Sequence, residues 1–357
     1  MTLHRRRNAQ SHAPLVSVII PVYNTEESYL RDCLRPFIQH ADPRIEVIVV
    51  DDGSQPATGE ILQRLVQGCS SAIQLLHRRN GGQNAARNTG IDASTGEYIE
   101  FLDSDDRIDW QSQLKVLDVL ETQHPDILGI NVIRCTPAGA AIGVLQFADP
   151  DSPYHDVPAE YVLRKCGALW NQIVRRDVFE RADIRLLEGI YIGEDLASIA
   201  PLIMSARKVG VVGTALYHFV DRPTSITHIV YPERLLDITK AFDFILNWMR
   251  LRVPTDGFDE AHWMPEIERL AIIHVCFRGV GRAVDWEGVH SPTIAKLKKY
   301  MVQRFPQWQS NSLYRDDGSM HTLNYRLVIS GHYRAYLLCL RVSHVLARLK
   351  SGRKRVI

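Results

Sequence analysis

Hydrophobic and polar positions alternate in blocks over the first hundred residues. Four short, largely apolar runs have the length of strands: Leu15–Ile20, Ile45–Val50, Ile73–His77 and Tyr98–Leu102. The first is rich in β-branched residues and is expected to be fully buried. Three stretches between them have helical periodicity: Glu26–His40, Thr58–Gln67 and Gly82–Ala93. Strands that alternate with helices are typical of βαβ units. The pattern therefore predicts an α/β fold with a mostly parallel, Rossmann-like sheet covered by helices.

The pattern loosens after about Ile127. Four less regular strands are predicted there: Ile127–Ile133, Ile142–Phe147, Val209–Val212 and Leu216–Val220. Helical periods then follow: Arg234–Leu251, Met264–Val284 and Pro292–Phe305. We therefore predict a polar tail over residues 1–14 and a helical C-terminal region over residues 231–357.

Polar side chains follow three of the predicted strands. They are Pro21–Asn24 after the first strand, Asp51–Ser54 after the second and Asp103–Asp106 after the fourth. The carboxyl ends of parallel strands lie at one edge of a sheet, where ligands of such sheets bind. We therefore expect these segments to lie together at a binding site.

The acidic segment Asp103–Asp106 is typical of a site for a hard divalent cation. Magnesium or manganese prefers carboxylate oxygens, and magnesium uses one or two of them together with ligand phosphates. A calcium loop of the EF-hand type does not fit, because its glycine and distant glutamate are absent. A solvated turn in which Asp103 or Asp106 caps the next helix remains an alternative.

The segment Asn80–Gly90 places two glycines before a helix that carries Arg87. Glycines let a backbone approach a ligand closely, and a helix amino terminus favours an anion. Arg87 is expected to contact a phosphate or a neighbouring aspartate, and a purely structural ion pair is the alternative. The sequence has no G-x-G-x-x-G fingerprint after the first strand and no Walker A lysine, which argues against dehydrogenases and P-loop proteins.

Four blocks in this order resemble the family 2 glycosyltransferases with a GT-A fold: Val18–Asn24, Val49–Ser54, Asn80–Gly90 and Phe101–Asp106. They cover residues 16–109. The resemblance implies that residues 15–115 are the nucleotide-sugar-binding half of a GT-A domain and that residues 116–230 are its acceptor-binding half. It also implies a set of nucleotide contacts: Pro21, Tyr23, Asn24, Asp52, Gly81, Arg87, Asp103 and Ser104.

The resemblance gives several of these residues a role. Pro21 and Tyr23 line the pocket of the base, and Asp52 pairs with a uracil-type edge. Asp103 lies near the ribose, while Asp105 binds Mg²⁺ or Mn²⁺ on the diphosphate.

The second half carries three shorter similarities. Leu169–Arg176 resembles a W-N-K-L segment of the family, although Gln172 replaces its usual lysine, and Gly193–Leu196 resembles the E-D block that supplies the catalytic base. Tyr217–Thr227 resembles an element of enzymes that build bacterial surface glycans.

These similarities imply that Asp195 is the base, with Glu194 as the alternative, and that Arg222 contacts the diphosphate. His218 is either a metal or phosphate contact or a half-buried histidine. Trp110 and Trp170 either stack on sugar rings or belong to the core.

The charge balance adds one exclusion. The 357 residues contain 42 lysines and arginines against 41 aspartates and glutamates, so no global charge indicates a nucleic-acid partner. Six dispersed cysteines suggest reduced core residues. The chain has no apolar run long enough for a transmembrane helix, and the basic N-terminal stretch is a poor secretory signal. These features predict a cytoplasmic protein.

The last forty residues, Gly318–Ile357, contain eight lysines or arginines and no acidic residue. In a helix, one face would hold Leu338, Val342, Val345 and Leu349, with Arg334, Arg341 and Arg348 beside it. This geometry suits peripheral contact with the anionic inner face of the cell membrane. Packing of the same face against the rest of the protein is the alternative.

The sequence as a whole predicts a metal-dependent, inverting hexosyl- or related transferase. It would move a sugar from a UDP-sugar to a hydroxyl of a glycan or lipid-linked acceptor in cell-surface polysaccharide biosynthesis. A non-catalytic nucleotide-sugar-binding or scaffold protein is the alternative. A sugar-1-phosphate nucleotidyltransferase fits less well, since the loop after the first strand, PVYNTEE, is neither glycine-rich nor basic. The oligomeric state stays open.

Overall fold

A computed structural model describes residues 13–67, 73–165, 167–222, 232–256, 258–313 and 323–342. They form two compact units. The first lies within Met1–Glu188 and Ser205–Arg222, and the second within Gly189–Met204 and Pro223–Ile357. Each unit is described by itself. The predicted division of residues 15–230 into a nucleotide-sugar half and an acceptor half stays a prediction.

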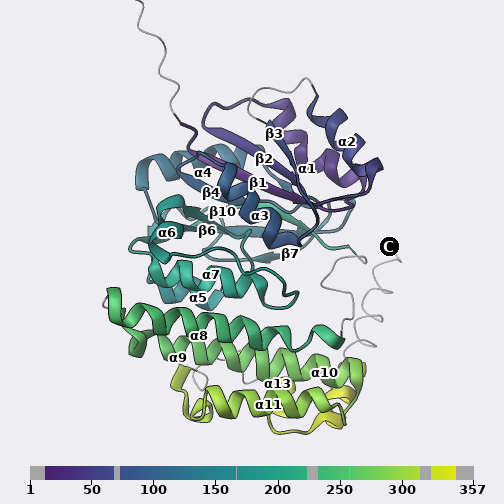
Figure 1. Ribbon diagram of the computed structural model, residues 1–357, viewed down its shortest axis with the longest axis vertical. Coiled ribbons are helices and arrows are strands. Elements are labelled where there is room, and N and C mark those ends of the chain that lie inside the picture. Colours follow the sequence, from purple (N-terminus) through teal and green to yellow (C-terminus); the bar gives the residue numbers. More distant parts are fainter. Residues whose placement is uncertain are drawn as a thin grey trace, which may run out of the picture. The chain divides into compact units, whose positions relative to one another are not determined.

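The first unit is built on a mixed sheet (Figure 1). Its strands are β1 (Val16–Val22), β2 (Ile45–Asp51), β3 (Ile73–His77), β4 (Tyr98–Phe101), β5 (Arg107–Ile108), β6 (Ile127–Cys135), β7 (Ala141–Leu145), β8 (His155–Asp156), β9 (Gln172–Arg175) and β10 (Val209–Val220). The order is β3-β2-β1-β4-β9-β6-β10-β5, with β7 on β6 and β8 on β10. The first four strands are parallel, as predicted. β9 runs antiparallel to both β4 and β6, whereas β6 and β10 are parallel, so the second half of the sheet is mixed.

Helices connect the strands of this unit. They are α1 (Glu27–Gln39), α2 (Pro56–Val66), α3 (Gln83–Ala93), α4 (Trp110–Gln123), α5 (Ala159–Lys165) and α6 (Arg176–Ala182). Val18 and Ile20 of β1 pack in one hydrophobic core with Leu34 of α1 and Leu120 of α4. Burying each such side chain contributes about 1.5–3 kcal/mol. On the other face, Ala86 of α3 packs with residues of β2.

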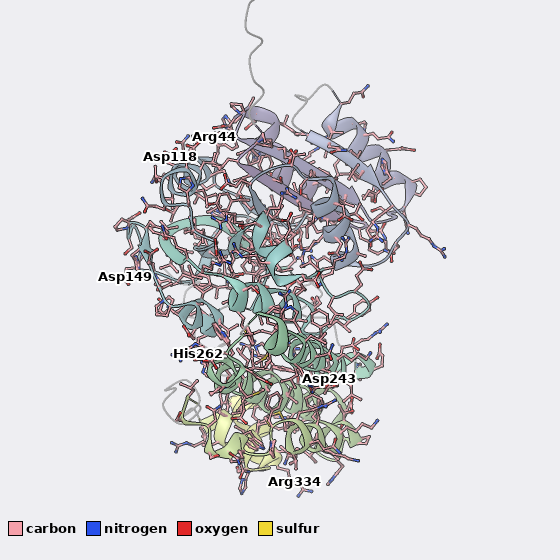
Figure 2. The ribbon with its side chains drawn as sticks, turned by 60° about the vertical axis from the view of Figure 1, so that its left-hand side comes forward. Arg44, Asp118, Asp149, Asp243, His262 and Arg334 are labelled. Carbon is pink, nitrogen blue, oxygen red and sulfur yellow. The ribbon has the colours of Figure 1, made fainter. Side chains whose placement is uncertain are left out.

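An ion-pair cluster joins the start of β2 to α4. The guanidinium of Arg44 lies 3.0 Å from a carboxylate oxygen of Asp118 and 3.1 Å from one of Glu121, and Figure 2 labels the first two residues. All three side chains are partly exposed, so each pair contributes less than about 1 kcal/mol. Hydrophobic burial therefore dominates the stability of this unit.

The first strand does not stop at Pro21, as the sequence suggested, but continues to Val22. The carbonyl of Ile19 accepts a hydrogen bond from the N–H of Leu102, so the backbone N–H and C=O groups of odd-numbered residues in β1 point toward β4. The last residue of β4 that pairs with β1 is Phe101, opposite Ile19. Pro21 faces the side where β4 has ended. Its missing N–H therefore removes no bond of the sheet.

One long strand replaces the two predicted at Val209–Val212 and Leu216–Val220. β10 spans Val209–Val220 and shifts register twice against β6, between Val212 and Ala215 and between Ala215 and Tyr217. Gly213 lies at the first shift, where a Cβ would sit 2.0 Å from the carbonyl oxygen of Asp149. The glycine therefore marks a bulge with close backbone contact and does not end the strand.

The second unit is helical, as predicted for residues 231–357. It contains α7 (Glu194–Ser205, whose last residue is grouped with the first unit), η2 (Pro232–Arg234), α8 (Asp237–Asp256), α9 (Glu260–Ala271), η3 (Ile272–Gly279), α10 (Val280–Glu287), α11 (Pro292–Arg304), η4 (Trp308–Ser310) and α13 (Leu323–Ile329). Phe242 of α8 and Phe305 pack edge to face with ring centroids 6.1 Å apart. Figure 1 shows α8 and α9 side by side. None of the described helices is long and apolar enough to cross a bilayer.

The described cysteines carry free thiols, as predicted. Cys33, Cys135 and Cys276 are buried and Cys339 is half-buried. Cys69 and Cys166 lie outside the described residues.

Candidate active site

Asp52, directly after β2, is held by the amino end of α3. Its buried carboxylate accepts the N–H groups of Gly82 at 2.8 Å and Gly81 at 3.1 Å and pairs with Arg78 at 3.1 Å. Burial raises the pKa of Asp52, and these bonds only partly oppose the shift. The sequence predicted that an anion binds at the amino end of α3. In the structure the carboxylate of Asp52 occupies that position.

A loop after β1 joins this group. The backbone N–H of Asn24 donates to the hydroxyl of Ser54 at 3.0 Å, and the amide oxygen of Asn24 accepts the N–H of Gln55 at 2.8 Å. Asn24 adopts a left-handed conformation with φ 51°, which asparagine tolerates better than most residues. Tyr23 beside it is 56% exposed, while Pro21 is buried. The ends of β1 and β2 therefore lie together, as predicted.

Arg87 binds the first aspartate of the acidic segment. Its guanidinium is buried and donates to Asp103 at 2.8 Å and to the amide oxygen of Asn84 at 3.0 Å. Gln83 donates to the same oxygen of Asp103 at 2.7 Å. The sequence predicted that Arg87 contacts a phosphate or a neighbouring aspartate, and the structure shows the contact with an aspartate, Asp103. Contact with a nucleotide stays a prediction.

Asp106 forms the centre of a buried network that sequence reasoning missed. Its carboxylate accepts the hydroxyl of Tyr217 at 2.6 Å and the N–H of Val220 at 2.7 Å. Burial, helped by the charge of Asp103, raises the pKa of Asp106 to about 8. The Tyr217 oxygen also accepts the N–H of Asp103 at 3.2 Å. Asp106 therefore fixes the acidic segment to β10 and does not cap α4, whose cap is Asp109.

The remaining residues of the acidic segment contact two other elements. Ser104 lies 2.7 Å, oxygen to oxygen, from Thr25 in the loop after β1. Asp105 forms an ion pair with Arg222, and the guanidinium carbon of Arg222 lies 4.8 Å from the ring centre of Tyr29 in α1. Hydrogen bonds and ion pairs therefore connect all four predicted blocks of the first unit.

Trp110, Trp170 and His218 were candidates for ligand contacts, but each one packs against other residues of the protein. Trp170 stacks on Tyr217 with centroids 4.8 Å apart and packs against the core, and Trp110 stacks on His40. Burial lowers the pKa of His218, and the charges acting on it are those of Asp109 and Arg107. His218 alternates with Tyr217 along β10, so the two side chains point to opposite faces of the sheet. The half-buried alternative for His218 is therefore favoured.

The predicted base lies in the helical unit. Glu194 and Asp195 form the first turn of α7, and Gly193 before them has φ +89°. A Cβ on Gly193 would lie 2.7 Å from Cδ1 of Ile238 and 3.0 Å from Cβ of Ala241 in α8, so the contact and the positive φ both favour glycine. The turn is also fixed by a hydrogen bond from the N–H of Tyr191 to Asp237 at 3.1 Å. The proximity of Asp195 to Asp105 stays a prediction, and Ser225–Thr227 lie outside the described residues.

The asparagines of α3 hold the segment that leads to this block. Asn84 donates to the carbonyl of Leu187 at 2.9 Å, and Asn88 donates to the carbonyl of Leu186 at 3.0 Å and to Glu188 at 2.8 Å. The sequence shows that Asn84 and Asn88 are four residues apart and can share one face of a helix. It does not show which distant segment they bind, because Leu186–Glu188 lie about a hundred positions away in the chain.

Comparison with known proteins places this site in a family. A family model described as glycosyl transferase family 2 matches residues 17–180. The uncharacterized glycosyltransferase EpsJ of Bacillus subtilis is 29% identical over 223 residues, which are 61% of this chain and 64% of EpsJ, so the match covers less than two thirds of that relative. The poly(ribitol-phosphate) beta-N-acetylglucosaminyltransferase TarS of Staphylococcus aureus is 24% identical over 58% of this chain and 35% of TarS.

A solved structure agrees in fold. The crystal structure of S. aureus TarS residues 1–349 in complex with UDP-GlcNAc superposes with a TM-score of 0.64 at 18% identity, over 90% of this chain and 89% of that one. The fold is therefore GT-A, with a helical C-terminal region. The matched family model, the related sequence and the shared fold agree with the four linked blocks, and residues 17–180 form a family 2 glycosyltransferase domain.

Proposed function

We propose that the protein transfers a hexose or a related sugar from a nucleoside-diphosphate donor, most simply a UDP-sugar. The acceptor is a hydroxyl of a glycan or of a lipid-linked molecule in cell-surface polysaccharide biosynthesis. One observation carries the proposal: Asp52 and Asp103 follow the parallel strands on either side of β1, and both are bonded to the amino end of α3. Ser104, between Asp103 and Asp105, is bonded to the loop after β1. The name of TarS, a poly(ribitol-phosphate) transferase, supports the acceptor class, and its UDP-GlcNAc complex supports the donor class.

The donor would lie against the first unit. The ring of Tyr23, directly after β1, is exposed and available to stack on a base, and Pro21 lies within β1, close to the same strand end. Asp52 keeps acceptor capacity for a uracil N–H, because a carboxylate has more lone pairs than the three donors that hold it. Arg222 would release Asp105 and bind a phosphate oxygen of the diphosphate, a preferred partner of a guanidinium.

The acidic segment fits Mg²⁺ or Mn²⁺ bound together with a diphosphate. In Asp105, the pair with Arg222 uses Oδ2 and leaves Oδ1 for a cation. In Asp103, Gln83 and Arg87 both donate to Oδ1, which leaves Oδ2 for a ligand. Asp106 is excluded as a ligand, since Tyr217 and Val220 occupy both its oxygens. No group of three or more metal-ligating side chains occurs in the described ranges, which suits magnesium, because it keeps waters and uses ligand phosphates. A bound cation would supply Lewis-acid stabilisation of the departing phosphate.

Asp195 is proposed as the general base that takes the proton of the acceptor hydroxyl. Its place in the first turn of a helix, behind a glycine that is packed against α8, holds the carboxylate on a rigid element. One base and no assigned covalent nucleophile favour direct displacement with inversion at the anomeric carbon. Glu194 is the alternative base.

We also propose peripheral membrane contact through the C-terminal helix. Residues 333–342 are helical, Leu338 is 63% and Val342 50% exposed, and Arg334 and Arg341 are exposed beside them. Exposed apolar and basic side chains on one helix are typical of binding to an anionic membrane surface. Val345, Arg348 and Leu349 of the predicted face lie outside the described residues.

A donor screen tests the proposal. Thermal unfolding is measured with UDP-sugars and other nucleotide sugars, with and without Mn²⁺, and release of free nucleotide is followed in the same samples. Stabilisation by a nucleotide sugar together with slow nucleotide release would support a transferase. Stabilisation without any release, even with added acceptor glycans, would favour the non-catalytic binder, and neither effect with any donor would contradict the proposal.

A further inference from the structure

Three basic side chains follow one another at four-residue spacing on the continuous helical segment formed by α9, η3 and α10. They are His274 and Arg278 in η3 and Arg282 in α10. η3 is a π-helix, with hydrogen bonds from residue i to i+5, so residues four apart lie nearly one turn apart along it. The three side chains therefore share one face. Such π-helical segments are rare and frequently occur at functional sites.

The two arginines of this face have no neutralising partner within bonding distance. Among the described residues, neither guanidinium takes part in a hydrogen bond or an ion pair. The guanidinium carbon of Arg282 lies 5.8 Å from the ring centre of Trp286. Arg278 is exposed and Arg282 is half-buried. Two like charges this close repel each other, and burial and the charge of Arg278 both lower the pKa of Arg282. An anion between them would relieve that repulsion.

The histidine does not add charge to the face. Burial, together with Arg278, Arg282 and Arg269, lowers the pKa of His274 to about 3. Its ring is therefore neutral at physiological pH. The positive charge of the face comes from the arginines alone.

This face lies near the predicted catalytic block within the same unit. Gly193, directly before α7, packs against α8, and α8 contacts η3. The charge of Glu194, the first residue of α7, acts on Arg282, and Asp195 follows Glu194. A catalytic base must be within hydrogen-bond reach of the hydroxyl that it deprotonates. The donor is proposed to lie against the first unit, so a ligand group bound beside α7 is assigned to the acceptor.

We propose that Arg278 and Arg282 bind a phosphate group of the acceptor and place its hydroxyl at the E-D block. The planar guanidinium matches the oxygens of a phosphate in a two-bond geometry, and two arginines one turn apart can bind two oxygens of one phosphate or of adjacent phosphates. The acceptor is then a phosphodiester-linked polyol chain or a lipid-linked pyrophosphate. The assignment of this phosphate to the acceptor rests on the proposed function, whereas binding of the anion itself does not.

Direct binding tests the site without activity. The full chain, in buffer containing UDP to fill any nucleotide site, is titrated in a calorimeter with a glycerol phosphate oligomer, a short prenyl diphosphate and a glucuronate oligosaccharide. The variants are Arg278→Gln, the double variant Arg278→Gln/Arg282→Gln, and Arg250→Gln as the control, an exposed arginine of α8. Arg278→Gln alone removes an exposed side chain without bonded partners, so it keeps the test valid if the double variant fails to fold.

We expect the double variant to lose about tenfold or more in affinity for a phosphate probe, as removal of charge-assisted hydrogen bonds predicts, and the control to match the wild type. Loss with the oligomer identifies a phosphodiester chain, and loss with the prenyl diphosphate identifies a lipid pyrophosphate. Equal affinity in the double variant and the control, no binding of either phosphate probe by the wild type, or loss confined to the glucuronate would overturn the proposal. Donor hydrolysis is followed separately, since its absence in the wild type would sink the proposed function and leave the anion site standing.

Discussion

At the scale of single residues, the adjacent acids of α7 have separable predicted roles. Asp195→Asn removes the proposed base but keeps the size of the side chain, so turnover should fall by about 10²–10⁴-fold while donor binding is retained. Glu194→Gln should have a smaller effect. The measurements are steady-state transfer rates and the donor-induced shift in unfolding temperature. If Glu194→Gln is the slower enzyme, the two assignments are reversed.

A second residue, Glu100 of β4, predicts a pH dependence of stability. Its carboxyl is fully buried with one bonded oxygen, which accepts the side chain of Gln113 at 3.0 Å, and burial raises its pKa from 4.5 to about 7. The folded state therefore keeps a proton that the unfolded chain releases between about pH 4.5 and 7. Stability is lost as the pH rises through this window.

Glu100→Gln should remove that loss. The variant should be more stable than the wild type by about 2–3 kcal/mol at pH 8 and about equally stable at pH 4. Urea unfolding at both pH values measures the difference, and Glu60→Gln on the exposed face of α2 is the control. A gain that is the same at both pH values would show that packing, and not ionisation, is responsible.

At the scale of elements, two glycines before α7 form a matched pair. Gly189 and Gly193 both have positive φ, +78° and +89°, but a Cβ on Gly189 meets nothing within 4 Å, whereas one on Gly193 meets Ala241 of α8 at 3.0 Å as well as Ile238. Gly189→Ala should cost only backbone strain, about 1–3 kcal/mol. Gly193→Ala should cost more and also displace Asp195.

The measurements are the free energy of unfolding and the transfer rate at a temperature where both variants are folded. We expect a further loss of about 1–3 kcal/mol in Gly193→Ala from overpacking, and a reduced rate that Gly189→Ala does not show. Equal stability and equal rates in the two variants would mean that the contact between the α7 turn and α8 does not position the catalytic block.

The elements also show how far the sequence could predict the structure. β2 begins at the predicted Ile45 and ends at Asp51, one residue beyond the predicted Val50, because a β-branched run in a parallel sheet is buried on both faces and needs no distant partner to be recognised. β9 was missed because its four residues begin with Gln172 and end with Arg175, so apolar alternation is absent. The carboxylates of the site were predicted, but the bond between Asp106 and Tyr217 joins residues 111 positions apart and depends on the order of the strands.

At the scale of the whole molecule, the formal net charge of +1 leaves no general attraction to an anionic surface. Membrane binding must therefore arise from a local patch. Arg334, labelled in Figure 2, and Arg341 are exposed beside the exposed Leu338 and Val342. Each basic side chain close to an anionic leaflet contributes about 1 kcal/mol to binding.

Reversal of both arginine charges, Arg334→Glu/Arg341→Glu, should lower the pelleting of the protein with phosphatidylserine vesicles by at least about tenfold in the partition coefficient. The reversal Lys296→Glu/Lys299→Glu on the exposed side of α11 changes the net charge equally and should leave most of the pelleting intact. Pelleting should also weaken with salt and be absent with neutral vesicles, because screening reduces the attraction. If both double variants lose pelleting equally, net charge and not this helix governs the interaction, and the peripheral site must be sought elsewhere.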